Sequence, residues 1–314
     1  MPEWWIERGI GETRYALVED GEIVEARIEL EGAVKAGSVI AARLKQVARP
    51  TIAIGGGVEY LLPRGAPGIT QGAALNIEIT RQAFPGSEPW KRPLARVTDA
   101  PTAEAESLSG RDLTFPSARD DLGFHGWNDM IEQARSGIVQ FAGAELRISP
   151  TPAMALIDVD GYLDTDELAV RGAAEAARAI RRLDVGGSIG IDLPTTRSKA
   201  VRQAAAKAID ANLPQPFERT AVNGFGFVQI VRPRLRASLV ELAQDRALFE
   251  ARALVRRTAF EPPGPKQLVA HPAVATVLEA HAEWFDALAR QLGGAISLRA
   301  DPTLPISGGY AEAT

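Results

Sequence analysis

The stretch from Gly143 to Asp192, GAELRISPTPAMALIDVDGYLDTDELAVRGAAEAARAIRRLDVGGSIGID, decides the fold of this chain. Its first half ends in the apolar run Leu156, Ile157 and Val159, which predicts a β-strand. Asp158 and Asp160 are set into that run two residues apart, so their side chains are expected to leave the strand on the same face. Two carboxylates on one face are unusual for a core strand.

The second half of the stretch predicts a helix followed by another strand. Asp164 and Glu167 have the Asp-x-x-Glu spacing of a capping box, and the Ala- and Arg-rich segment after them stops at Gly186-Gly187. A short apolar run from Ser188 then ends at Asp192. A strand, helix and strand of this length normally form a right-handed crossover between parallel strands, which end at the same edge of a sheet.

Asp158, Asp160 and Asp192 are therefore expected to converge at one edge. Carboxylates brought together in this way repel one another, so a cation binds between them or a pKa rises. Oxygen ligands with retained water are what Mg²⁺ prefers, and Mn²⁺ is an acceptable substitute. The alternative interpretation makes Asp160 a turn residue before Gly161 and Asp192 a loop residue before Pro194.

Composition limits the classes of function. The 314 residues are 46% hydrophobic, which suffices for a sizeable core and for two or three domains. No run approaches the length of a bilayer span and the N-terminus lacks the features of a secretory signal, so we expect a cytoplasmic protein with no membrane partner. The absence of cysteine excludes disulfides and thiolate zinc sites, and no zinc is expected. A net charge of −5 requires any polyanion site to be a local basic surface.

The first hundred residues have the pattern of β-structure. Two alternating runs, 13–19 and 22–29, flank Asp20-Gly21 and predict a hairpin. Short apolar runs over 38–46, 51–54, 59–62 and 74–80, separated by Gly and Pro, are typical of a small barrel such as an OB-fold. Gly55-Gly56-Gly57 is expected to be a tight turn or a bulge, because it lacks the Lys and Ser/Thr of a phosphate-binding loop.

The predicted fold class is mixed α+β and α/β: an N-terminal hairpin and an OB-fold barrel, then an α/β core with a deoxyribonuclease-I-like or RNase-H-like sheet, and C-terminal helices. The predicted segments are 1–35 (a hairpin packing on the core), 36–98 (the barrel), 99–125 (a linker), 126–240 (the α/β core with the acidic site) and 241–314 (a helical region). Within the core, a strand over 225–231 ends in an arginine cluster. Arg232 and Arg234 are candidate phosphate ligands, or else surface arginines paired with acidic residues.

Three blocks carry a resemblance to a known family: GAELRISPTPAMALIDVDG, RAIRRLDVGGSIGID and FGFVQIVRPR. In this order and at this spacing they resemble the catalytic core of the ribonuclease E and G family, which typically reads GGYLVINPTEALVxIDVNSG, RQLRLRDLGGLIVIDF and FGLLEMTRQR. The similarity covers about 126–241 well and about 4–98 loosely, where the hairpin and barrel resemble the start of the family, whose inserted OB-fold binds RNA.

The resemblance implies an endoribonuclease that hydrolyses internal phosphodiester bonds of single-stranded RNA and leaves 5′-phosphate and 3′-hydroxyl ends. The family's two Mg²⁺-binding aspartates correspond to Asp158 and Asp192, and Asp160 stands at the family's Asn. Lys91 falls near a lysine that contacts RNA in the family, and Tyr60 lies close to an aromatic position of its RNA channel.

The chain also departs from the family pattern. The family's 5′-monophosphate sensor segment is replaced by a short connection, and the cysteines that link two protomers through zinc are missing, so any homodimer forms by another route. Gln229 stands at a family Glu, and Ala169 to Ala173 replace its NLEAA stretch. These changes leave open a second hypothesis, a catalytically inactive RNA-binding or assembly protein. A calcium loop at 158–169 fits poorly, because Leu163 replaces the turn Gly and Ala169 the bidentate Glu.

Overall fold

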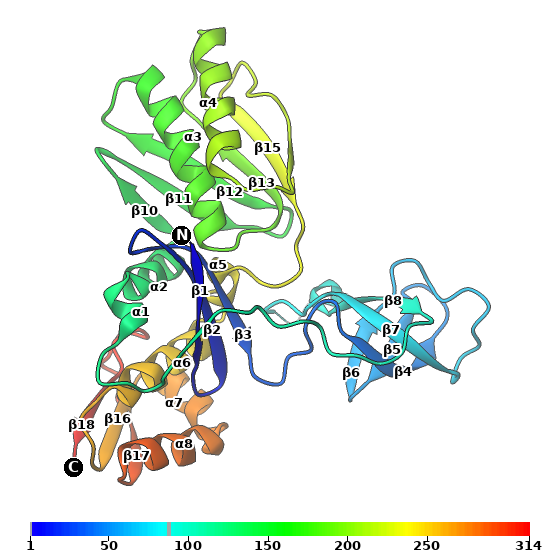
Figure 1. Cartoon of the computed structure of the whole chain (residues 1–314), viewed down its shortest axis with the longest axis vertical. Coiled ribbons are helices and arrows are strands. Elements are labelled where there is room, and N and C mark those ends of the chain that lie inside the picture. Colours follow the sequence, from blue (N-terminus) through cyan, green and yellow to red (C-terminus); the bar gives the residue numbers. More distant parts are fainter. Residues whose placement is uncertain (1, 87–88) are drawn as a thin grey trace. The chain divides into compact units, whose positions relative to one another are not determined.

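The computed structural model describes residues 2–86 and 89–314 and is a mixed α/β protein with a closed five-stranded β-barrel (Figure 1). The chain divides into two compact units. Unit 1 comprises Met1–Glu31, Gly110–Ser136 and Leu242–Thr314, and unit 2 comprises Gly32–Ser109 and Gly137–Glu241. Across the described residues, none of the helices combines the length and the apolar character needed to cross a bilayer.

Unit 1 begins with the predicted hairpin, extended to a four-stranded sheet. The strand order is β3 (Glu22–Leu30), β2 (Glu12–Glu19), β1 (Glu3–Arg8) and β9 (Arg111–Leu113), and β9 runs parallel to β1. Asp20 and Gly21 connect β2 to β3 with φ of 50° and 86°, the left-handed conformations of the tight hairpin turn that this dipeptide favours. The hairpin prediction is therefore confirmed.

The rest of unit 1 is a helical region with a second small sheet. Its helices are α1 (Asp121–Phe124), α2 (Trp127–Ser136), α6 (Arg246–Ala259), α7 (Pro272–Glu279) and α8 (Ala282–Leu292). The sheet has the order β17 (Ile296–Ala300), β16 (Lys266–Ala270) and β18 (Tyr310–Ala313). Ile10, from the loop between β1 and β2, belongs to the same apolar core as Leu254, Leu268 and Trp284. The N-terminal sheet and the C-terminal region therefore share one apolar core within unit 1.

A buried ion network also ties the N-terminal sheet to α6. Arg14 Nη1 donates to Glu7 Oε1 (2.6 Å), and Arg256 Nε donates to the same oxygen (2.9 Å). Arg256 Nη2 donates to Asp120 Oδ1 (2.5 Å), and Asp120 also caps α1 by accepting from Gly123 N–H. The side chains of Glu7, Arg14 and Arg256 are at most 4% exposed, so each charge depends on its partners for stabilisation.

Unit 2 contains the closed barrel, with the strand order β4 (Val39–Gln46), β5 (Ile52–Gly55), β6 (Val58–Leu61), β8 (Leu94–Thr98) and β7 (Ala74–Arg81). The four predicted strands are present, and β8 is the fifth, which the sequence pattern had not indicated. Gly56 and Gly57 turn the chain between β5 and β6 with positive φ, as expected for a tight turn. The interior is filled by the Tyr60 ring together with alanine and larger aliphatic side chains such as Leu44 and Ile77.

The other part of unit 2 is a six-stranded mixed sheet with helices on one face (Figure 1). Its order is β10 (Ile138–Phe141), β11 (Ala144–Pro150), β12 (Ala155–Gly161), β13 (Gly187–Asp192), β15 (Phe227–Arg232) and β14 (Glu218–Arg219). Helices α3 (Thr165–Arg182) and α4 (Lys199–Asn212) pack together over it. Strands β12 and β13 pair in parallel on either side of the α3 crossover, as predicted.

The segment predicted as a linker, 99–125, has structure of its own. Val39 and Ala103 exchange backbone hydrogen bonds beside the barrel (2.8 and 3.0 Å). The segment also contributes β9 to one sheet of unit 1 and the short helix α1. Only partner strands distant in sequence make this order possible, which is why the Pro- and Ser-rich composition gave no sign of it.

Candidate functional site

The candidate site is a row of four side chains across the central strands of the six-stranded sheet. Arg147 on β11 is the register partner of Asp158 on β12, and Asp158 is the partner of Asp192 on β13. Phe227 on β15 continues the row beside Asp192. Side chains in register on neighbouring strands stand on the same face about 5 Å apart. The sequence prediction that Asp158 and Asp192 come together is therefore matched by the sheet register.

This row lies on the face of the sheet that α3 and α4 do not cover. Ile157 and Val159, which alternate with the aspartates, are at most 3% exposed beneath the helices. Asp158, Asp160 and Asp192 are exposed. The alternation of apolar and acidic residues in β12 thus places the apolar side chains on the helix-covered face and the acidic side chains on the opposite, open face.

The environment of Asp158 opposes its ionisation. Partial desolvation at the sheet surface, and then the negative charges of Asp160 and Asp192, raise the pKa of Asp158 above its ordinary value. A hydrogen bond from Val159 N–H and the positive charge of Arg147 act in the opposite direction. A bound cation would relieve the repulsion between the carboxylates and favour the charged form of Asp158.

The three carboxylates do not converge as closely as predicted. Within 2–86 and 89–314, no group of three or more His, Cys, Asp or Glu side chains lies close enough to hold one metal ion together. Asp160 is two residues beyond Asp158, where its register partner is Glu145 rather than a residue of β13. The donors that the register brings together are therefore the pair Asp158 and Asp192, and two carboxylates with several retained waters suit Mg²⁺.

The local structure around β13 fixes the position of Asp192. A Cβ on Gly190 would lie 2.6 Å from Cζ of Phe227 and 3.0 Å from a methyl group of Leu156, so the ring and the methyl group pack over a position that only glycine permits. Beyond the strand, Thr196 Oγ1 donates to Asp166 Oδ1 (2.6 Å) at the start of α3. The loop after Asp192 is thus anchored to the helix that follows Asp160.

A pocket of about 670 Å³ opens beside the carboxylates, along β10, β11 and the end of β12. Its lining includes Gln140, Glu145, Arg147, Asp160 and Tyr162. Arg147 Nη2 pairs with Glu145 Oε1 (2.5 Å), and the Tyr162 side chain is fully exposed. The sequence reasoning missed Arg147 and Tyr162. The alternation of Glu145 and Arg147 with buried Leu146 and Ile148 was the available signal for the face on which they stand.

The two candidate phosphate ligands of the arginine cluster are engaged within unit 2. Arg232 Nη1 donates to the carbonyl of Val185 (3.1 Å). Arg234 pairs with Glu241, and its guanidinium lies 3.9 Å from the centre of the Phe84 ring. These contacts match the structural alternative, in which the arginines pair with nearby groups, and their phosphate-binding role stays a prediction.

The barrel candidates have different environments. Tyr60 is 2% exposed and lies in the barrel core, because its place in alternating β6 points it inward. The RNA contact that the family resemblance implied for Tyr60 is not supported by this position. Lys91 is half-buried at the end of the 3₁₀ turn η1 (Pro89–Lys91). Trp90, beside it, is 63% exposed.

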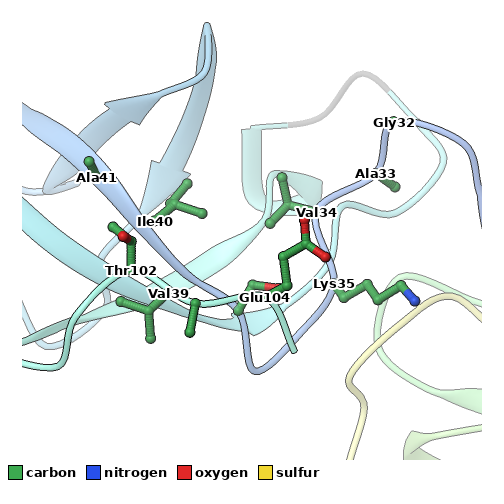
Figure 2. A pocket seen from close by; sticks show the side chains of 11 residues that line it. Gly32, Ala33, Val34, Lys35, Val39, Ile40, Ala41, Thr102 and Glu104 are labelled. Atoms are coloured by element: carbon green, nitrogen blue, oxygen red, sulfur yellow. The ribbon is translucent and has the colours of Figure 1, made fainter. Parts of the chain in front are cut away.

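A second hollow lies beside the barrel and has a different character. Figure 2 shows it between the start of β4 and the segment that follows β8, with Val34, Val39 and Ile40 among its lining residues. Lys35 and Glu104 are its charged residues, and Lys35 Nζ donates to Ser107 Oγ (3.1 Å). Its lining is mainly apolar.

Comparison with known proteins leaves the site to be interpreted from its own geometry. No protein-family model matches this chain, and no curated protein matches it either.

Proposed function

We propose that this protein is a Mg²⁺-dependent endoribonuclease that hydrolyses internal phosphodiester bonds of single-stranded RNA, leaving 5′-phosphate and 3′-hydroxyl ends. The observation that carries the proposal is the direct register pairing of Asp158 with Asp192 on the uncovered face of a sheet. The raised pKa of Asp158 supports it, because repelling carboxylates on an accessible surface are poised for a cation.

Asp158 and Asp192 would hold the metal, Mg²⁺ or alternatively Mn²⁺, and no zinc. When bound, such an ion supplies a Lewis acid and a water of lowered pKa. Asp160 is exposed two residues further along the same face, where its carboxylate accepts a hydrogen bond from water and orients it. Arg147 places one positive charge next to Asp158, on the side away from Asp192.

The proposal includes finer assignments of fold, partner and location. We assign the closed five-stranded barrel to the OB-fold class, which binds single-stranded nucleic acid, with Lys91 as an RNA contact and Arg232 and Arg234 as phosphate ligands. We assign the six-stranded sheet to a deoxyribonuclease-I-like or RNase-H-like core. We place the protein in the cytoplasm, with a homodimer as the oligomer to test, formed without any zinc-cysteine link because the chain has no cysteine.

A second candidate is an RNA-binding or assembly protein without cleavage activity. The observation that favours it is the loose acidic cluster, in which Asp160 faces Glu145 rather than the Asp158–Asp192 pair. Gln229 supports the same candidate, because its side-chain amide donates to Ser188 Oγ (3.0 Å) and supplies no carboxylate to the face.

The deciding experiment is cleavage of a short fluorescent single-stranded RNA in Mg²⁺ and in EDTA. The wild-type chain is compared with an Asp158→Asn, Asp192→Asn double variant and with a charge-matched control, Asp99→Asn, Asp286→Asn, which alters two exposed carboxylates elsewhere. We expect metal-dependent cutting by the wild type and the control, and none by the site variant. Equal RNA binding by all three proteins without cutting by any would identify the second candidate.

A further inference from the structure

Two aromatic side chains stand out for their exposure. Tyr162 is 102% exposed and Phe225 is 79% exposed, the two highest values among the large apolar side chains of the part of the chain that the structure describes. Phe124, the next most exposed, has the Arg119 guanidinium 3.7 Å from its ring centre. An aromatic ring left in water forgoes the apolar burial that usually stabilises it, so its exposure is informative about binding.

The sheet topology places both rings at one edge. Tyr162 comes directly after β12, and β12 and β13 are parallel, so their carboxyl ends share that edge. Strand β15 is antiparallel to β13 and therefore starts there, two residues after Phe225. The strand order β12, β13, β15 puts Asp192 of β13 between the segments that carry the two rings, and Asp158 lies on β12, the strand that leads to Tyr162.

The loops hold the backbone at both positions. Tyr162 N–H donates to the carbonyl of Gly143 (2.9 Å), at the β10–β11 turn. Phe225 N–H donates to Asn223 Oδ1 (2.9 Å), and the Phe225 carbonyl accepts from Thr195 Oγ1 (3.0 Å). Backbone hydrogen bonds therefore fix both positions while the rings stay in solvent. This arrangement suits a ring that stacks on a ligand better than one that packs in a core.

We propose that Tyr162 and Phe225 are base-stacking platforms for single-stranded nucleic acid, Tyr162 at the end of the strand that carries Asp158 and Phe225 at the start of the strand next to Asp192. This inference deepens the proposed function and rests on it for the position of the scissile phosphate. Stacking on aromatic rings is sequence-tolerant, because every base has a π-face. The pocket beside Tyr162, with Gln140 and Arg147 in its lining, receives the nucleotide on that side.

The charges at this edge add a condition. Glu145 and Asp160 line the pocket together with Arg147, and Asp158 and Asp192 lie next to it, so carboxylates outnumber the arginine. A phosphate backbone is repelled by such a surface unless a cation neutralises it. Binding of the strand at this edge therefore requires a divalent cation.

The test measures binding by fluorescence anisotropy, with a labelled 12-nucleotide single-stranded DNA and an abasic oligomer of the same length, in Mg²⁺ and in EDTA. Tyr162→Ala, Phe225→Ala is compared with Tyr162→Phe, Phe225→Tyr, which keeps both rings, and with Tyr310→Ala, which removes an exposed ring in unit 1. We expect the alanine double variant to bind the base-containing oligomer in Mg²⁺ roughly 5- to 150-fold more weakly per ring lost. Its binding to the abasic oligomer should stay within about twofold of the wild type.

The ring-keeping variant Tyr162→Phe, Phe225→Tyr and the distant variant Tyr310→Ala should bind both oligomers as the wild type does. If the alanine double variant retains the full preference for bases over the abasic backbone in Mg²⁺, the inference is overturned. RNA cleavage by the wild type separates the two proposals. If the wild type cuts RNA and the alanine double variant keeps its base preference, the stacking inference fails and the endonuclease proposal stands. If the wild type does not cut RNA and the alanine double variant loses its base preference, the stacking inference stands and the endonuclease proposal fails.

Discussion

Glu7→Gln tests the buried ion network that holds unit 1 together. Glu7 accepts from Arg14 Nη1 (2.6 Å), from Arg256 Nε (2.9 Å) and, through its second oxygen, from Arg256 Nη2 (3.1 Å). The amide of glutamine removes the negative charge between two almost completely buried guanidinium groups, and even with its C=O at the Oε1 position its NH2 group faces Arg256 Nη2. Arg14 keeps Glu12 and Arg256 keeps Asp120, but each loses one of its two carboxylates.

Breaking a buried charge pair by altering one partner typically costs about 3–5 kcal/mol of stability, because the remaining charge is left uncompensated. We expect a loss in this range from the free energy of unfolding of unit 1. The assay is urea unfolding followed by tryptophan fluorescence in a Trp90→Phe background. Trp90 belongs to the barrel, and the other four tryptophans, Trp4, Trp5, Trp127 and Trp284, all belong to unit 1.

The matched control is Glu22→Gln, which neutralises an exposed glutamate on β3 of the same sheet and should change stability by less than about 0.5 kcal/mol. If Glu7→Gln also costs less than about 1 kcal/mol, the network does not contribute as argued, and the N-terminal sheet is held to α6 by apolar packing alone.

Three further predictions concern pH, packing and a helix cap. Burial raises the pKa of Asp120, but the hydrogen bonds and charge of Arg256 outweigh it and lower the pKa below its ordinary value. Asp120 therefore stabilises the fold at pH values above its unfolded pKa of about 4, and this stabilisation is lost as the pH falls. The free energy of unfolding of unit 1, followed by tryptophan fluorescence, should consequently fall less steeply between about pH 5 and 2 in Asp120→Asn than in the wild type. Gly190→Ala should lower the free energy of unfolding of unit 2 by about 1–3 kcal/mol, because the added methyl group would meet the Phe227 ring. An unchanged thermal unfolding curve, followed by circular dichroism, would contradict the close packing. Ser198→Ala should cost about 1 kcal/mol in the same melt, because the hydroxyl caps the first turn of α4, whereas Ser198→Asp should retain most of the stability.

The sequence predicted the carboxylate pair because that prediction needed only local information. The alternation of Ile157 and Val159 with acidic residues settled which face the aspartates share, and the crossover rule set the direction of the next strand. The structure matches both steps, with Asp158 opposite Asp192. The further step, convergence of Asp160, was wrong because a strand advances about 3.3 Å per residue, so a residue two positions further on lies beyond the pair.

The features that sequence reasoning missed depend on partners distant in the chain. Residues 111–113 form a strand because β1 lies alongside, and Arg256 is buried because Glu7, some 250 residues earlier, receives it. Tyr60 illustrates the same limit in the barrel: its nearness to an aromatic position of the family suggested an RNA contact, but the face on which it stands follows from how the strands close on one another. Propensity and spacing specify an element, and tertiary pairing decides what its side chains meet.

Two glycines explain why the candidate site has a fixed geometry. On the covered side, Gly172 of α3 lies against the Val159 side chain, closely enough that a Cβ there would overlap a methyl group. On the open side, Gly190 leaves the space that the Phe227 ring fills. A one-residue slip of β12 would turn aspartate side chains under the helices and move Ile157 and Val159 to the open face, so the apolar packing of the covered face opposes it. The register that joins Asp158 to Asp192 is thus held by the apolar core and not by any attraction between the two carboxylates, whose negative charges repel each other.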